Sequence, residues 1–365
     1  MRIVPLILAL SMSGLLVLSN ACAQSNGSQL TYNDGPYIFY ENGLAVARWI
    51  SEGKLKADTL KKGTLLELDK GVSPSFDAAY LRPGGAFEVC RQTTFKDVEK
   101  IAAISDIHGQ YDVFFRLLQA NRLIDDGGNW AFGQGHLVIV GDVFDRGEEV
   151  TEILWLINKL EQQAEMAGGK VHYLLGNHEI MALQGDLRYI NKKYRYTSAS
   201  LQRPYNEIFG PDSYLGRWLR TKPIAISINK IAFVHAGYSE QYLQLGFSEE
   251  ALNKAFRERI LDKPEDAIMA DPVLRILYGE SGPVWYRGYF KDGFDQAQAR
   301  SILKQARMKH IVVGHTSFSA IRTLFRNRII GIDSSIKFGK SGEILLYENK
   351  HFYRGTISGE KLPLN

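Results

Sequence analysis

Mostly apolar runs alternate with amphipathic segments from about residue 98 onward. The apolar runs, which are typical of buried strands, predict strands at 101–104, 136–140, 171–175, 224–235 and 310–313. Apolar residues at helical spacing predict helices at 113–118, 150–166 and 296–307. Two later runs, near 328–333 and 343–347, are predicted to form hairpins. This alternation indicates an α/β fold, with helices outside the sheets and a functional site at the carboxyl ends of the strands.

The region before residue 98 has a different pattern. Residues 24–97 are rich in Tyr and Gly and contain β-like runs at 37–40, 64–68 and 87–90, without visible chemistry. We therefore predict an N-terminal β-rich extension at 24–97, a catalytic domain at 98–355 and a C-terminal tail at 356–365.

Residues 1–23 have the three parts of a secretory signal peptide. Arg2 precedes an uncharged, apolar run at 3–18, and an Ala-x-Ala site ends at Ala23, so we expect cleavage after Ala23. The run has 16 residues, which is short for a bilayer span of about 20. We expect an exported, periplasmic protein with no integral membrane segment after processing. The alternatives are a lipoprotein with a lipidated Cys22, whose preceding residues fit that motif poorly, and an uncleaved anchor.

Composition narrows the class of protein. The 365 residues are 45% hydrophobic and 23% charged, as in ordinary globular proteins. A net charge of +4 is too small to argue for nucleic acid or an anionic membrane as a partner. Two cysteines cannot form a disulfide framework. Cys90, which remains after cleavage, has Val89 before it and Lys96 six positions later, so it lacks the His and Arg of a cysteine-dependent phosphatase.

Five polar motifs follow the predicted strands. They are SDIHGQ at 105–110, GDVFDRG at 141–147, GNHE at 176–179, VHAG at 234–237 and VGHT at 313–316. Each contains a Gly, which lets the backbone turn sharply beside a ligand. Because all five lie at strand ends, we interpret them as parts of one site.

These motifs supply oxygen and imidazole ligands, from Asp106, His108, Asp142, Asn177, His235 and His315. This mixture suits two divalent ions of Mn, Fe or Zn, and differs from the all-oxygen sites of calcium. Six side chains for two ions require a shared ligand, and Asp142, with two carboxylate oxygens, is the natural bridge. Two cations about 3.5–4 Å apart would acidify a bridging water and hold phosphate oxygens during in-line attack. A structural zinc site would contain thiolates, and the motifs contain no cysteine.

In their order and in their residues, the motifs resemble those of the metallophosphoesterases of the phosphoprotein phosphatase superfamily. Four longer stretches, at 174–181, 185–189, 217–223 and 282–288, are similar to the Shewanella-like protein phosphatases within it. The resemblance covers about residues 98–350. It implies a central β-sandwich flanked by helices. Val143-Phe144 and Ala236 depart from the eukaryotic Ser/Thr enzymes, which weakens the case for a Ser/Thr preference.

The resemblance also implies roles for individual residues. One metal ion would be held by Asp106, His108 and Asp142, and the other by Asp142, Asn177, His235 and His315. His178 would donate a proton to the leaving oxygen, oriented by Asp145, whose charge favours the imidazolium. Arg146 offers a planar fork for two phosphate oxygens. Arg287 is either a second clamp or an ordinary surface arginine, and Asn177 completes the predicted substrate-binding set.

We therefore predict an exported phosphomonoesterase that dephosphorylates phosphoprotein or phosphopeptide by direct attack of a metal-bridging hydroxide. The preference for phosphotyrosine comes from the resemblance alone. Alternatives are a Ser/Thr or dual-specificity phosphatase, and a small-molecule phosphoesterase acting on nucleotides or dinucleoside polyphosphates. An inactive metal-binding module is disfavoured because His178, Asp145 and Arg146 are intact.

Two further features receive non-catalytic interpretations. The basic and aromatic run at 192–196 has a composition that can bind single-stranded nucleic acid. It covers only five residues of a protein predicted to be exported, so we expect a solvated loop near the site and no nucleic-acid partner. Four other histidines lie outside the motifs and are expected to be structural or exposed: His136, His172, His310 and His351.

Overall fold

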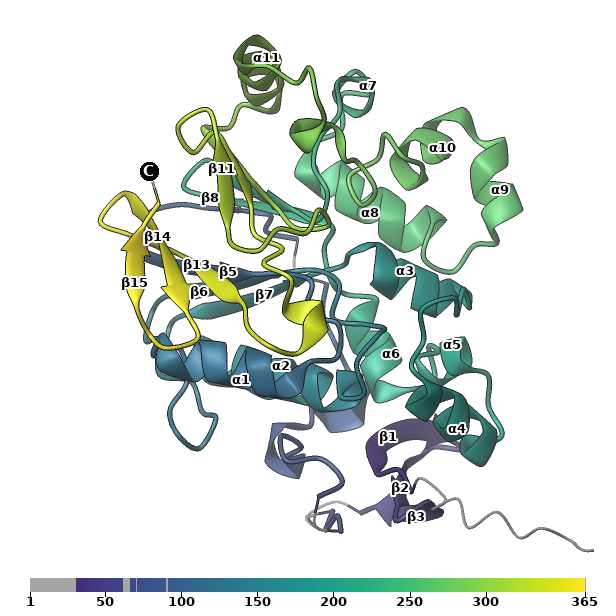
Figure 1. Cartoon of the computed structure of the whole chain (residues 1–365). Coiled ribbons are helices and arrows are strands. Elements are labelled where there is room, and N and C mark those ends of the chain that lie inside the picture. Colours follow the sequence, from purple (N-terminus) through teal and green to yellow (C-terminus); the bar gives the residue numbers. More distant parts are fainter. Residues whose placement is uncertain (1–30, 62–65, 70, 90, 365) are drawn as a thin grey trace, which may run out of the picture. The chain divides into compact units, whose positions relative to one another are not determined.

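The computed structural model describes residues 31–61, 66–69, 71–89 and 91–364 (Figure 1). The predicted signal peptide and Cys90 lie outside the described residues. In the part of the chain that is described, no helix has both the length and the apolar character needed to cross a membrane.

Two six-stranded sheets dominate the described residues. The first has the order β15-β14-β13-β5-β6-β7. Its strands are β5 (Lys100–Ile104), β6 (His136–Val140), β7 (Lys170–Leu174), β13 (Glu343–Glu348), β14 (His351–Thr356) and β15 (Lys361–Pro363). The second has the order β11-β12-β10-β9-β8-β4. Its strands are β4 (Thr94–Phe95), β8 (Ala225–Ile228), β9 (Ile231–Val234), β10 (His310–Val313), β11 (Arg322–Leu324) and β12 (Ile329–Gly331).

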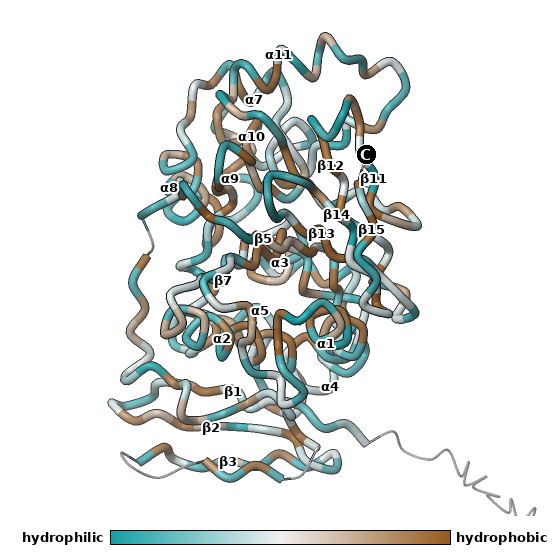
Figure 2. Tube along the Cα trace, turned by 90° about the vertical axis from the view of Figure 1, so that its left-hand side faces the viewer, coloured by the Kyte–Doolittle hydropathy of each residue, from teal (hydrophilic) through white to brown (hydrophobic). Residues whose placement is uncertain are grey.

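The two sheets pack face to face. Their facing side chains form one buried apolar cluster, to which the first sheet contributes Val138 and Leu174 and the second Phe233 and Val312. Hydrophobic residues accordingly run along β5 and β13 in the middle of Figure 2. The predicted α/β fold with a central β-sandwich is therefore confirmed.

Helices cover the outer faces of the sandwich. On the side of the first sheet lie α1 (Tyr111–Ala120) and α2 (Val150–Met166) (Figure 1). Between the two sheet-forming regions of the chain come α3 (Asn177–Gln184), α4 (Lys192–Leu201), α5 (Tyr205–Ile208) and α6 (Tyr214–Leu219). The remaining α-helices described are α7 (Glu240–Leu243), α8 (Glu249–Arg259), α9 (Glu265–Ala270), α10 (Pro272–Tyr278) and α11 (Gln296–Ala306). Short 3-10 turns occur at Ala78–Tyr80, Pro83–Gly85, Gly288–Phe290 and Ile336–Phe338.

Most predicted elements are confirmed, and four are wrong in part. The run at 224–235 is a β8–β9 hairpin, because Asn229 and Lys230 both adopt a left-handed turn conformation. Residues 87–89 and 66–68 are not in strands. The run at 192–196 begins α4 and is not a solvated loop.

A third sheet lies in the N-terminal extension and consists of β1 (Asp34–Glu41), β2 (Leu44–Ser51) and β3 (Lys54–Leu60). A buried ion cluster connects it to the helices. The Nζ atom of Lys193, on α4, lies 2.8 Å from a carboxylate oxygen of Glu152 on α2 and 3.6 Å from one of Asp34 on β1. Lys193 is only 4% exposed, and a buried charge is tolerated only when it is paired. This cluster therefore fixes β1, α2 and α4 relative to one another.

Candidate metal centre

The five motifs converge where strands of both sheets end. Asp106 and His108 follow β5, Asp142 follows β6, and Asn177 begins α3 just after β7. The second sheet contributes His235 after β9 and His315 after β10. All six predicted metal ligands are buried. The structure thus brings together side chains that are up to 209 residues apart in the chain, from Asp106 to His315.

The backbone around these ligands is strained. Asp106, His108, Asp142 and His315 have φ values of 54°, 48°, 58° and 64°, in the left-handed region that non-glycine residues rarely adopt. Such conformations cost about 1–3 kcal/mol each and persist only where the surrounding structure holds them, often at active sites. Close packing also requires glycine at position 314, because the Cβ atom of any other residue there would lie 2.3 Å from an Asp106 oxygen.

Asp142 lies at the centre of the donor atoms. Its Oδ2 atom is 3.2 Å from Nε2 of His235 and 3.8 Å from Nε2 of both His108 and His178. The donor atoms form two groups that could each hold an ion, and Asp142 is a member of both. One group contains His108 and His178, and the other contains His235 and His315. A carboxylate shared by two groups has the placement expected of a bridging ligand.

Of the other predicted ligands, Asn177 lies beside the second group, whereas Asp106 lies outside the first group, whose third member is His178. Nε2 of His235 lies 3.0 Å from Oδ1 of Asn177 and 3.2 Å from Nδ1 of His315. The other ring nitrogen of His315 is buried and has no hydrogen-bond partner among the described residues. An Oδ1 atom of Asp106 is 4.0 Å from Nε2 of His108. Unpaired buried nitrogen and converging oxygen donors fit divalent transition metals such as Mn, Fe or Zn.

Backbone carbonyls orient two of the imidazoles. The Nδ1–H group of His108 donates to the carbonyl of Phe144, and that of His235 donates to the carbonyl of Val140, both at 2.7 Å. Because Nδ1 donates to a carbonyl, Nε2 is the nitrogen that each imidazole directs to the centre of the site. Metal-binding histidines commonly have such a partner on the second nitrogen.

Protein charges set the ionisation of this centre. Burial alone would raise the pKa of Asp142, but the imidazoles of His235 and His178 outweigh it and hold that pKa well below its usual value. Burial would conversely lower the pKa of His235, and the charge of Asp142 raises it to about 10. A negative Asp142 beside positive charge is the ionic form that a bound cation would also favour.

His178, which belongs to the first group, also forms a buried pair with Asp145. Nδ1 of His178 is 2.5 Å from a carboxylate oxygen of Asp145, and its Nε2 faces Asp142. Burial would lower the pKa of His178, but the charge of Asp142 and the hydrogen bond to Asp145 raise it above the ordinary value. The pair therefore favours the protonated form of the imidazole.

The two predicted arginines lie at the edge of the centre. Arg146 is exposed, and its backbone N–H donates to the carbonyl of Tyr189 at 3.1 Å. Arg287 is also exposed, and its Nη1 donates to the carbonyl of His315 at 2.6 Å. Arg287 is thus attached to the backbone of a predicted metal ligand, which favours the clamp over an ordinary surface arginine.

Sequence reasoning gave no role to Glu179, which organises the site. This fully buried carboxylate accepts hydrogen bonds from the backbone N–H groups of Asp142, Val143 and Gly176 at 2.7–2.8 Å, and from the hydroxyl of Tyr173 at 2.9 Å. The available signal was its position, because a Glu three residues after a helix N-cap often forms a capping box. Glu179 makes the half of this motif that a glycine N-cap allows, because its carboxylate accepts the backbone N–H of Gly176.

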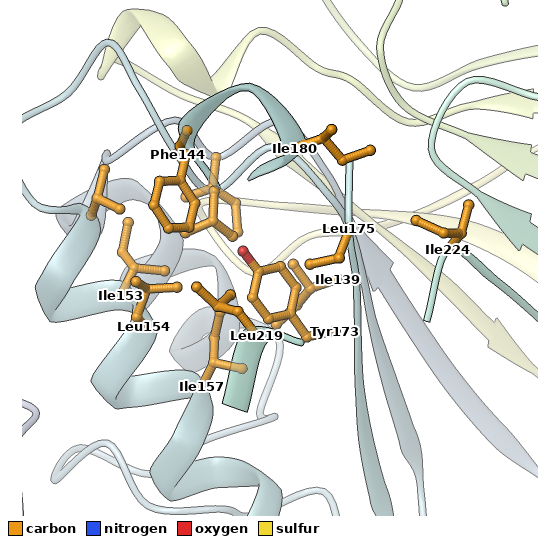
Figure 3. Close-up of a cluster of buried hydrophobic side chains, with 14 of the residues drawn as sticks. Ile139, Phe144, Ile153, Leu154, Ile157, Tyr173, Leu175, Ile180, Leu219 and Ile224 are labelled. Atoms are coloured by element: carbon orange, nitrogen blue, oxygen red, sulfur yellow. The ribbon is translucent and has the colours of Figure 1, made fainter. Parts of the chain in front are cut away.

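Two polar side chains near Asp106 were also missed. Ser105 donates its hydroxyl to Asp106, whose Oδ2 also accepts the backbone N–H of His315 at 2.9 Å. Asp333 is buried nearby, and after burial itself it is the main cause that raises the pKa of Asp106. Below the site, Phe144 and Ile180 belong to an apolar core that also contains Ile153 of α2 (Figure 3).

Comparison with known proteins agrees with this geometry. Residues 99–317 match the calcineurin-like phosphoesterase family. Over 102 residues, the chain is 44% identical to Shewanella-like protein phosphatase 2 of Arabidopsis thaliana, covering 28% of this chain and 26% of that protein. Over 149 residues it is 35% identical to Shewanella-like protein phosphatase 1 of Plasmodium berghei, covering 38% and 39%. The chain thus matches less than half the length of these two relatives.

A solved structure gives a match over more of the chain. The cold-active protein-tyrosine phosphatase of a psychrophilic Shewanella species is 40% identical and superposes with a TM-score of 0.85. The match covers 92% of this chain and 100% of that one.

The shared position of Asp142 can be tested by Asp142→Asn, which preserves the shape and Oδ1 but removes the charge. We expect the variant to lose about one metal equivalent and nearly all phosphatase activity, because both ions are needed for the attack. Metal content by mass spectrometry and turnover of p-nitrophenyl phosphate are measured together. Asp112→Asn, in an exposed carboxylate of α1, is the matched control. Two bound metals with full activity in Asp142→Asn would remove this residue from the bridging role.

Proposed function

The chain belongs to the calcineurin-like phosphoesterase family and is related to the Shewanella-like protein phosphatases, and we propose that it is a two-metal phosphomonoesterase acting on phosphotyrosine in proteins or peptides. The observation that carries this proposal is Asp142, which is shared by two groups of possible metal-binding side chains, one of which includes His178 of the buried His178–Asp145 pair. Hydrolysis of a phosphate ester can use two metal ions to activate the attacking water and a nearby proton donor to protonate the leaving oxygen.

Different residues would bind the metal ions, bind the phosphate and donate the proton. Asp106, His108, Asp142, Asn177, His235 and His315 would hold two divalent ions. When bound, such ions supply Lewis acidity and a reactive water at neutral pH. Arg146 and Arg287, at the edge of the centre, would bind phosphate oxygens through their guanidinium groups. His178 would give the proton on Nε2 to the leaving oxygen, while Asp145 holds Nδ1–H and stabilises the imidazolium.

Tyr189 supports an aromatic leaving group. The residue is 43% exposed, and its ring centroid lies 5.2 Å from the ring centroid of His178 and 5.2 Å from Cζ of Arg146. The leaving oxygen receives its proton from His178, so the group attached to that oxygen lies beside the imidazole. Tyr189 therefore offers a ring surface where a phosphotyrosine side chain would sit and a phosphoserine side chain would have little to contact.

His178→Asn tests the acid role. The benefit of a general acid, typically 10²–10⁴-fold, should shrink as the leaving group becomes less basic. We expect both metals to remain and kcat to fall most for a phosphoserine peptide, less for a phosphotyrosine peptide (phenol pKa about 10) and least for p-nitrophenyl phosphate. Asp145→Asn should give the same ranking with smaller losses, since the imidazole stays but is poorly oriented. Equal losses on all three substrates with metal retained would identify His178 as a phosphate-binding group.

Tyr189→Ala tests the aromatic contact. We expect kcat/KM for a phosphotyrosine peptide to fall about three- to tenfold more than that for a phosphoserine peptide of the same sequence, as the loss of one aromatic pair predicts. Tyr189→Phe keeps the ring and should retain the preference. A nucleotide panel run alongside distinguishes the small-molecule alternative. If both peptides lose activity equally, Tyr189 does not select the substrate, although the enzyme remains a phosphatase.

We also propose that the protein is exported, because of the signal-like residues 1–23. Intact-mass analysis of protein isolated from a bacterial periplasmic fraction should then show Gln24 as the first residue. A lipid-modified Cys22 at the N-terminus would establish the lipoprotein alternative, and an unprocessed Met1 in the cytosolic fraction would contradict export.

A further inference from the structure

The segment from 296 to 332 is strongly and one-sidedly basic. It contains seven Lys and Arg residues and no Asp or Glu, although the whole chain has 44 basic and 40 acidic residues. The segment comprises α11, β10, β11 and β12, which lie together in the upper part of Figure 1. Folding therefore concentrates positive charge at one end of the second sheet.

Five of these cations line one pocket of about 440 Å³. They come from three separate segments: Arg300 and Lys304 on α11, Lys309 just before β10, and Arg326 and Arg328 in the turn between β11 and β12. We call this the α11–β12 pocket. None of the described residues that line it is acidic. It lies at the first residue of β10, whereas the predicted metal ligand His315 follows the last, so it is distinct from the metal centre.

The charges of the pocket have no ion-pair partner among the described residues. The negative end of the α11 dipole stabilises the charge of Lys304, which lies in the last turn of this helix. It does not explain why Lys309, Arg326 and Arg328 are gathered there as well. Like charges gathered without compensation destabilise the folded state, so an anion would relieve their repulsion.

The turn that presents Arg326 is strained and held in place. Phe325, Arg326 and Asn327 have φ values of 52°, 58° and 60°, three successive non-glycine residues in the left-handed region. Asn327 holds the turn, because its Nδ2 donates to the carbonyl of Leu364 at 3.0 Å and its carbonyl accepts from Nδ1 of His310 at 2.6 Å. Strain of this kind, maintained by surrounding contacts, is characteristic of ligand clamps.

The positive potential reaches His310, which also lines the pocket. Burial lowers the pKa of this imidazole, and the charges of Lys309 and Arg328 lower it further against the opposing hydrogen bond to Asn327.

We propose that the α11–β12 pocket binds an anion that carries two or more phosphate groups. Guanidinium groups bind phosphate oxygens in a bidentate manner, and three of the five cations are arginines. A single phosphate would leave much of the positive charge uncompensated. The volume is within the range of small-ligand sites. Such a ligand is either a free polyphosphate or the headgroup of a diphosphorylated lipid.

The test uses the full mature protein and the double variant Arg326→Ala/Arg328→Ala. Calorimetry with inorganic tripolyphosphate should show a binding event in the wild type whose affinity falls about tenfold or more in the double variant, because charge-assisted hydrogen bonds are lost. Arg322→Ala is the matched control, since this exposed arginine lies on β11 but does not line the pocket. Turnover of p-nitrophenyl phosphate should stay unchanged in the double variant, which shows that the fold and metal centre are intact.

A second arm identifies the source of the phosphate groups. Sedimentation with vesicles of phosphatidylcholine and cardiolipin is compared with pure phosphatidylcholine vesicles. Tripolyphosphate binding without vesicle binding supports a free ligand, and cardiolipin-dependent sedimentation that the double variant loses supports a lipid headgroup. Absence of both, tripolyphosphate affinity unchanged in the double variant, or an equal loss in Arg322→Ala overturns the proposal. None of these outcomes depends on whether the metal centre prefers phosphotyrosine.

Discussion

The metal centre depends on the buried carboxylate of Glu179. Its two oxygens accept N–H groups from the loop after β6 and from the turn after β7, so the ends of two adjacent parallel strands are connected through one side chain. This arrangement lets Asp142 adopt a left-handed conformation and direct its carboxylate inward. Burying a carboxylate is costly unless its hydrogen bonds are satisfied. Here four donors satisfy it, and the energy that they supply fixes the loop that carries the shared ligand.

The second sheet closes the site from the other side. His235 and His315 follow adjacent parallel strands, β9 and β10, and meet Asp142 from the first sheet. Apolar side chains between the sheets, such as Val138 and Phe233, set the distance between them. The geometry of the metal ligands thus depends on how the two sheets pack, because a shift of one sheet against the other would separate His235 from Asp142.

Local sequence patterns predicted the features that depend on neighbouring residues, namely the strands and the polar motifs at their ends. Apolar runs located most strands, and the polar motifs at their ends identified the residues that the structure brings together. What was missed depends on contacts between distant parts of the chain. Glu179 and Ser105 act on neighbours that only folding supplies. The run at 192–196 looked like a solvated loop because it is basic, yet Lys193 is buried, since Asp34 and Glu152 neutralise it from elsewhere in the chain.

The helix that contains Lys193 also supports the loop that carries Arg146. Asn191, its N-cap, donates to the carbonyl of Arg146, and the hydroxyl of Tyr194 accepts the N–H of Val150. The same helix is held to β1 by the buried ion cluster, so the N-terminal extension and the loop that carries Arg146 share a support. A shortened enzyme that retained only the family region would leave an ammonium group in the interior with half of its neutralising charge removed. Asp34 of the extension therefore supplies one of the two carboxylates that neutralise Lys193, and the family region alone would keep a buried positive charge that is only partly compensated.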